Sequence, residues 1–102
     1  MKPIVSVIAP VFNEAGVVDE LVGRIASSLG ALEERYDLEI VLVNDGSRDN
    51  SLAVCRDLLR NCPVPLTVVD LARNFGEHNA VMAGLRHASG AWVITIDRKS
   101  VV

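Results

Sequence analysis

Polar and charged side chains that could bind a small ligand gather in four short segments, each of which directly follows an apolar run. The segments read PVFNEAG (10–16), NDGSRDNS (44–51), ARNFGEHNA (72–80) and DRKSVV (97–102). The Asp45 carboxylate could accept the N–H of a flat heterocycle, and the neighbouring Gly46 would leave room for that ring to approach. Arg73 could pair with two oxygens of a phosphate. These residue types predict a site for a ligand that contains both a flat heterocycle and a phosphate.

Local structure alone explains the first two segments about as well as a ligand does. Pro10 predicts a rigid turn, Asn13 a helix cap, and Glu14 a carboxylate beside the N-terminus of a helix. Asp45-Gly46 is also a strong turn signal. Neither GxGxxG nor GxxxxGK[ST] occurs, so both common phosphate-binding fingerprints are absent. No single segment therefore indicates a function, and only the four segments in combination can.

Apolar runs alternate with helical spacing along the chain. Short continuous apolar runs at 4–9, 38–43, 66–71 and 91–96 predict strands. Between them, apolar residues recur every three or four positions within 17–29, 52–59 and 81–88, which predicts three helices. Strands that are buried on both faces and joined by helical crossovers pair in parallel. The predicted class is α/β, a doubly wound parallel sheet whose ligands are met at the carboxyl ends of its strands.

Length and composition limit the chain to a single globular domain and exclude some partners. The 102 residues are half apolar and carry a net charge of -3, so we expect no nucleic-acid partner. No apolar run approaches the ~20 residues that span a bilayer. Cys55 and Cys62 lack metal-ligand spacing. We expect buried thiols and a soluble or peripheral protein in a reducing cytoplasm.

The strand-end series VIAPVFNE, VLVNDGSRDNS, RNFGEHNAVMAGLRHASG and WVITID resembles the N-terminal half of a family 2 glycosyltransferase of the GT-A fold. The resemblance covers residues 4–97 and is closest to the polyprenyl-phosphate branch, which moves a sugar from a nucleotide diphosphate to undecaprenyl or dolichyl phosphate. It implies a Rossmann-like nucleotide-sugar-binding half with parallel strand order 3-2-1-4. Residues 1–97 are accordingly interpreted as a partial glycosyltransferase 2-like domain, and residues 98–102 as a tail foreign to it.

The same resemblance assigns expected binding roles to individual residues and assigns no residue to catalysis. It implies that the nucleoside pocket is lined by Pro10, Asn13 and Glu14. It implies that Asp45 accepts the uracil imide proton, and that Arg73 and Asn74 lie near the diphosphate. Asp97 would open the D-x-D motif, whose carboxylates bind ribose and a divalent metal, Mg²⁺ or Mn²⁺, in the complete family enzyme.

The chain departs from the family at this last motif. It reads Asp97-Arg98-Lys99, so an ammonium replaces the second carboxylate, which is the main metal ligand. Mg²⁺ and Mn²⁺ need hard oxygen ligands, and a lysine would place a positive charge at the metal-binding position. The sequence therefore predicts a broken metal site, and a frameshift or a truncated gene would account for the tail.

For the complete enzyme the resemblance implies inverting transfer from a nucleotide-diphosphate sugar, with UDP as the expected nucleotide, onto a lipid phosphate at the cytoplasmic face of the membrane. This chain is expected to bind the donor without completing transfer. Two alternatives stay open at this point: a non-catalytic nucleotide-binding remnant and an unrelated flavodoxin-like binding module. In order 3-2-1-4 the fourth strand, AWVITI, would be an uncharged apolar edge, which predicts a homodimer or an aggregate.

Overall fold

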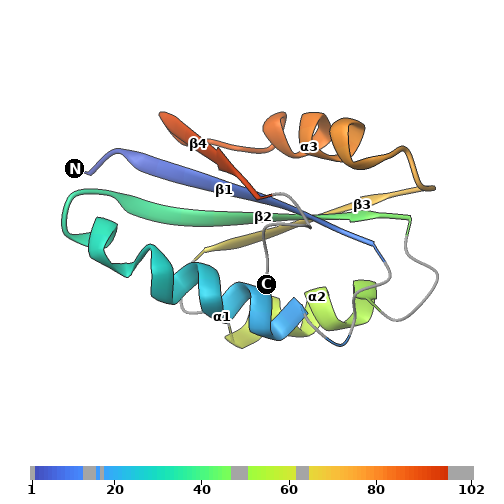
Figure 1. Ribbon diagram of the computed structural model, residues 1–102, viewed down its shortest axis with the longest axis horizontal. Coiled ribbons are helices and arrows are strands. Elements are labelled where there is room, and N and C mark those ends of the chain that lie inside the picture. The colour runs from blue at the N-terminus through green and yellow to red at the C-terminus, as the bar shows by residue number, and fades with distance from the viewer. Residues whose placement is uncertain (1, 13–15, 17, 47–50, 62–64, 97–102) are drawn as a thin grey trace.

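The protein is a four-stranded sheet between two layers of helix, seen along its edge in Figure 1. The computed structural model describes residues 2–12, 16, 18–46, 51–61 and 65–96. Its elements are β1 (Ile4–Val11), α1 (Val18–Ser28), a 3-10 helix η1 (Gly30–Glu34), β2 (Asp37–Asp45), α2 (Ser51–Asn61), β3 (Leu66–Leu71), α3 (Glu77–Leu85) and β4 (Trp92–Thr95). All four predicted strands and all three predicted helices are present, whereas η1 was not predicted.

All strand pairs are parallel, and the strand order is β3-β2-β1-β4. This confirms the predicted order 3-2-1-4. It differs from the order 2-1-3-4-5 of flavodoxin-like folds, so the flavodoxin-like alternative is wrong. Because all four strands run parallel, their carboxyl ends lie at one edge of the sheet, which is where ligands bind in open α/β sheets.

β1 continues two residues beyond its predicted end and includes Pro10, which pairs with Val43 of β2. Proline normally interrupts a central strand because it lacks an N–H. The backbone of Ile8 bonds toward β4, since Ile8 O accepts from Ile96 N at 2.9 Å. The backbone of Pro10, two residues further along β1, also faces the β4 side of the strand. However, β4 pairs with β1 only as far as Ile8. The missing N–H therefore costs no ladder bond.

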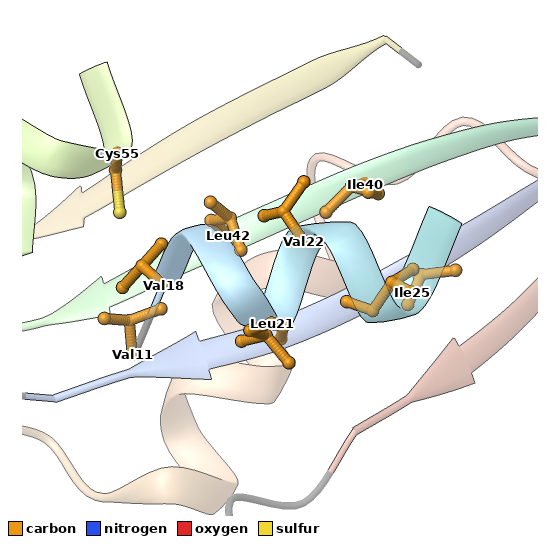
Figure 2. Close-up of a cluster of buried hydrophobic side chains, with 10 residues drawn as sticks. Val11, Val18, Leu21, Val22, Ile25, Ile40, Leu42 and Cys55 are labelled. Carbon is orange, nitrogen blue, oxygen red and sulfur yellow. The ribbon is translucent and has the colours of Figure 1, made fainter. Parts of the chain in front are cut away.

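The larger hydrophobic core lies between the sheet and the helices α1 and α2. Figure 2 shows α1 lying across β1 and β2 with its apolar side turned toward them. This core contains Val7, Ala9, Val11, Val18, Leu21, Val22, Ile25, Ile40, Leu42 and Cys55. Burial of the Cys55 thiol confirms that prediction, and Cys62 lies outside the described residues. The apolar spacing of α1 thus fixes one face of the sheet.

α3 covers the opposite face alone, where Ala80 packs with Ile8, Val41 and Val43. The backbone of α3 lies close to the sheet. A Cβ added at Gly84 would lie 2.6 Å from Ile8 Cγ2 and 3.0 Å from Val43 Cγ2, so no larger residue fits without displacement. Small residues on its inner side thus bring α3 directly onto β1 and β2. No helix among the described residues is long and apolar enough to cross a membrane.

A polar cluster at the amino end of the sheet holds the chain where it leaves α3. The Glu39 carboxylate accepts hydrogen bonds from Ser6 Oγ and from the backbone N–H of Ser89, the latter at 2.7 Å. Gly90 N donates to Ser6 Oγ at 2.8 Å. Burial raises the pKa of Glu39, but the hydrogen bonds from Ser6, Ser89 and Gly90 together outweigh it and leave the pKa below its usual value. The charged carboxylate is the form that the fold prefers.

This cluster predicts a pH-dependent contribution to stability. Because folding lowers the pKa of Glu39, its contribution is present at neutral pH and is lost as the pH falls through the folded-state pKa. Glu39→Gln should lower the free energy of unfolding by about 1 kcal/mol at neutral pH, as expected for a lost hydrogen bond. Urea unfolding across a pH series should show this loss shrinking in acid. Glu34→Gln, at an exposed position of η1, is the control, and equal pH profiles for wild type and Glu39→Gln would contradict the claim.

β4 is an edge strand that pairs only with β1, as the predicted order requires. All four of its residues are exposed, and Trp92 is exposed to 62%. An uncharged, apolar edge with one unpaired row of N–H and C=O groups is a template for another strand. Association of two copies along this edge stays a prediction.

Sedimentation velocity over a concentration series tests the edge directly. Wild type should form dimers or larger species as concentration rises. Val93→Lys, which puts a charge in the middle of β4, should shift the chain toward monomer. Wild type that remains monomeric at high micromolar concentration would show that the edge does not pair.

Candidate functional site

The site begins at the end of β2, where the buried Asp45 meets the loop between β3 and α3. Asp45 has no solvent exposure, and its Oδ1 accepts a hydrogen bond from Phe75 N at 2.8 Å. A buried carboxylate is tolerated only when donors compensate for its lost hydration. The Phe75 amide is one such donor, so Asp45 fixes the loop that follows β3.

The β3–α3 loop is further held by its own side chains. Gly76 N donates to Asn74 Oδ1 at 2.9 Å, and Asn79 Nδ2 donates to Phe75 O at 2.8 Å. The Arg73 guanidinium lies 4.8 Å from the centre of the Phe75 ring, a cation–π contact. These contacts organise the loop, which holds a cation at the carboxyl edge of the sheet.

Gly46 brings the second and third strand-end loops into direct contact. Its φ of 67° lies in the left-handed region that favours glycine. A Cβ at this position would overlap the backbone of Arg73 and Asn74. We expected Gly46 to leave room for a flat ring, but the backbone of this loop occupies that space. Gly46 therefore serves the packing of the two loops.

Sequence reasoning missed Asn44, which lies on the other face of the sheet beside Asp45. Asn44 is 3% exposed, and its Nδ2 donates to Asp70 Oδ1 at 3.1 Å. Asn44 Oδ1 is buried and has no hydrogen-bond partner among the described residues. Its only signal in the sequence was its place at a strand end. A buried acceptor without a donor is costly, so this atom marks a point where a ligand donor would be stabilised.

The structure brings together three of the predicted site residues, Asp45, Arg73 and Asn74, through the contacts above. Pro10 is buried one strand away, on β1. The predicted residues Asn13, Glu14 and Asp97 lie outside the described residues. The binding role assigned to each of these seven residues stays a prediction.

Comparison with known protein families matches residues 6–98 to the model "Glycosyl transferase family 2". That match covers most of the chain and includes β2, β3, β4 and all but the first two residues of β1. The chain belongs to glycosyltransferase family 2. Its sheet order is that of the GT-A fold, as expected from the strand-end segments.

Curated relatives of this glycosyltransferase domain include the undecaprenyl-phosphate 4-deoxy-4-formamido-L-arabinose transferases of Edwardsiella ictaluri and Pseudomonas syringae pv. syringae. The first is 41% identical over 93 residues, which are 91% of this chain and 28% of the relative. The second is 41% identical over 101 residues, 95% of this chain and 29% of the relative. The chain therefore spans less than a third of the length of these relatives.

Solved glycosyltransferase structures share the fold. The mannosyltransferase PcManGT from Pyrobaculum calidifontis, in complex with GDP-Man and Mn²⁺, superposes with a TM-score of 0.77 at 31% identity over 91% of this chain and 26% of that one. S. aureus TarS 1–349 in complex with UDP gives 0.73 at 28% identity over 95% of this chain and 27% of that one. Both comparisons support the GT-A fold of the chain.

The metal ion of PcManGT raises the question of a divalent site in this glycosyltransferase domain. No three His, Cys, Asp or Glu side chains in the described part of the chain are grouped so that they could hold an ion. On the family resemblance alone, Asp97 would supply one carboxylate, and Lys99 would stand where the second is expected. One carboxylate beside a lysine does not fit Mg²⁺ or Mn²⁺. The donor set of this chain therefore gives no reason to route chemistry through a metal.

The contact at Gly46 yields a test with a built-in control. Gly46→Ala should destabilise the fold by about 2 kcal/mol or more, since it adds a left-handed alanine and a clash with the Arg73–Asn74 backbone. Gly76→Ala, at φ 94° with open space around its Cβ, should cost only the backbone strain. Urea unfolding and hydrogen exchange of the Phe75 amide measure both effects. Equal losses in the two variants would mean that the loops do not depend on close contact.

Proposed function

We propose that this chain binds the nucleotide part of a nucleotide-diphosphate sugar, with UDP as the nucleotide, at the carboxyl edge of its sheet. The observation that carries the proposal is the contact of two strand-end loops through Asp45, Gly46 and Phe75, which holds Arg73 at that edge. A guanidinium can pair with two diphosphate oxygens at once. As the family resemblance implies, the Asp45 carboxylate would accept the uracil imide proton, and a carboxylate can accept from more than one donor.

Two further features support a ligand at this edge. Asn44 Oδ1 is a buried acceptor without a partner among the described residues, and a ribose hydroxyl or a base N–H would satisfy it. UDP is bound in the TarS structure, and GDP-Man in the PcManGT structure. Pro10, Asn13, Glu14, Asn74 and Asp97 complete the proposed pocket, as the family resemblance implies.

For the complete protein we infer sugar transfer to a polyprenyl phosphate at the cytoplasmic face of the membrane. The relatives named undecaprenyl-phosphate 4-deoxy-4-formamido-L-arabinose transferase support this acceptor class. An acceptor phosphate oxygen would attack the sugar C1 as the bond from C1 to the diphosphate oxygen breaks, so UDP leaves and the configuration inverts. The acceptor oxygen is already anionic, so the attack needs no strong general base.

For this chain of 102 residues we infer donor binding without transfer. A second candidate function for the chain is that of a nucleotide-binding remnant. It is favoured over a working transferase because Lys99 stands in place of the second carboxylate. Asp97 retains one oxygen ligand, which suits a ribose hydroxyl better than an ion beside an ammonium. The chain would then hold the donor's nucleoside and diphosphate, while attack on C1 belongs to the complete protein.

Calorimetric titration with UDP and with uridine tests the proposal. Arg73→Ala should weaken UDP binding by about tenfold or more, the effect of losing a charge-assisted hydrogen bond of about 1.5 kcal/mol. Uridine binding should change little, because uridine has no phosphate for Arg73 to contact. Arg73 is exposed and forms no salt bridge within the described residues, so the variant should remain folded.

Arg35→Ala is the matched control, since it removes an exposed arginine just before β2, at the opposite edge of the sheet. It should leave both affinities unchanged. Wild type that binds neither uridine nor UDP would refute the proposed function. Equal losses for uridine and UDP in Arg73→Ala would show that Arg73 supports the nucleoside site and would remove it from the diphosphate.

A further inference from the structure

α3 exposes the large apolar side chains of Met82 and Leu85 to solvent, beside the polar His78 and Asn79. Its inner side packs Ala80 and Gly84 against β1 and β2. Between His78 and Leu85 the sequence reads HNAVMAGL and contains no Asp, Glu, Lys or Arg. An exposed helix normally carries several charged residues on its outer side, whereas the whole of α3 contains one, Glu77 at its first position. α1 follows the usual pattern, with an ion pair between Arg24 and Glu20 on its exposed side.

Large apolar side chains are exposed along this outer side. Met82 is 49% exposed, Leu85 38%, and Phe75, in the loop just before the helix, 42%. A cavity of about 350 Å³ opens beside them, lined by Leu71, Phe75, Asn79, Met82, Ala83 and Arg86. Phe75, Met82 and Arg86 line one hollow, so they form one continuous surface. Exposed apolar patches of this kind mark interaction sites.

Arginines stand at both ends of this surface in an otherwise acidic chain. Arg73 stacks on Phe75 before the helix, and Arg86 follows Leu85 at its end. Segment 71–88 holds these two arginines and one acidic residue, Glu77, a net charge of +1, whereas the whole chain carries -3 and the remainder therefore -4. The nearby Asp45 carboxylate is buried, and Asp70 is bonded to Asn44 on the other face of the sheet. The net charge is thus slightly positive where the exposed apolar side chains are, because this segment has few acidic residues.

We propose that the α3 outer surface, formed by Arg73, Phe75, Met82, Leu85 and Arg86, docks on an anionic lipid surface. Exposed apolar side chains flanked by arginines bind the interface of anionic membranes by inserting carbon between headgroups while the guanidinium groups pair with lipid phosphates. The inference stands on exposure and charge and does not need the proposed function. That function gives the surface a use, because docking would bring the loop that carries Arg73 to a lipid-bound acceptor.

Flotation of the purified chain with vesicles tests the proposal, since aggregated protein does not float. Wild type should float with phosphatidylcholine vesicles that contain phosphatidylglycerol and much less with phosphatidylcholine alone, and 0.5 M salt should reduce the bound fraction. Met82→Ser with Arg86→Glu should lower partitioning by about tenfold or more, since each arginine near an anionic surface contributes about fivefold.

The matched control is Leu59→Ser with Arg60→Glu on α2, where Leu59 is exposed to the same 49% as Met82. It should float like wild type. Equal loss in both double variants, or no flotation of wild type, would overturn the proposal, and the second result would point to a protein partner for this surface. If the double variant does not fold, flotation of Met82→Ser alone tests the proposal instead. UDP titration of the same samples reports on donor binding separately, so failure of one proposal is distinguishable from failure of the other.

Discussion

The hydrogen bond from the Phe75 amide to the buried Asp45 carboxylate is the constraint on which the candidate site depends. Asp45 loses its hydration on folding, so it requires donors, and the Phe75 N–H at 2.8 Å is one of them. Gly46, the next residue, packs against the backbone of Arg73 and Asn74. The loops after β2 and β3 are thereby fixed as one unit, and the position of the Arg73 cation relative to the end of β2 follows from that unit.

A second carboxylate on the same strand acts in the same way at the other end of α3. Glu39 and Asp45 lie six residues apart on β2 and point to the α3 face of the sheet. Asp45 accepts the Phe75 N–H before the helix, and Glu39 accepts the Ser89 N–H after it. Between these two bonds, Gly84 allows the helix to lie directly on β1 and β2. β2 thus holds α3 at both ends, while packing fixes its middle.

The elements of this fold could be predicted from the sequence because apolar runs and helical spacing are local signals. Their order in the sheet, and the site residues Asp45, Arg73 and Asn74, followed from resemblance and from position at strand ends. The contacts that hold the site could not be predicted, because Asp45 and Phe75 are 30 residues apart and Glu39 and Ser89 are 50 apart. Asn44 was missed for the same reason. Gly46 was noticed but misinterpreted, since only the folded chain places Arg73 and Asn74 against it.

Phe75 connects the two proposed binding surfaces, because its main chain belongs to one and its ring to the other. Its amide points inward to Asp45, while its ring is 42% exposed and lies under the Arg73 guanidinium. The proposed donor pocket and the proposed lipid-docking surface therefore share the segment from Arg73 to Phe75. Binding energies at sites that share a conformational element are coupled reciprocally. Lipid binding that changes the position of Arg73 would thus change the affinity for the nucleotide donor, and donor binding would change the affinity for lipid by the same factor.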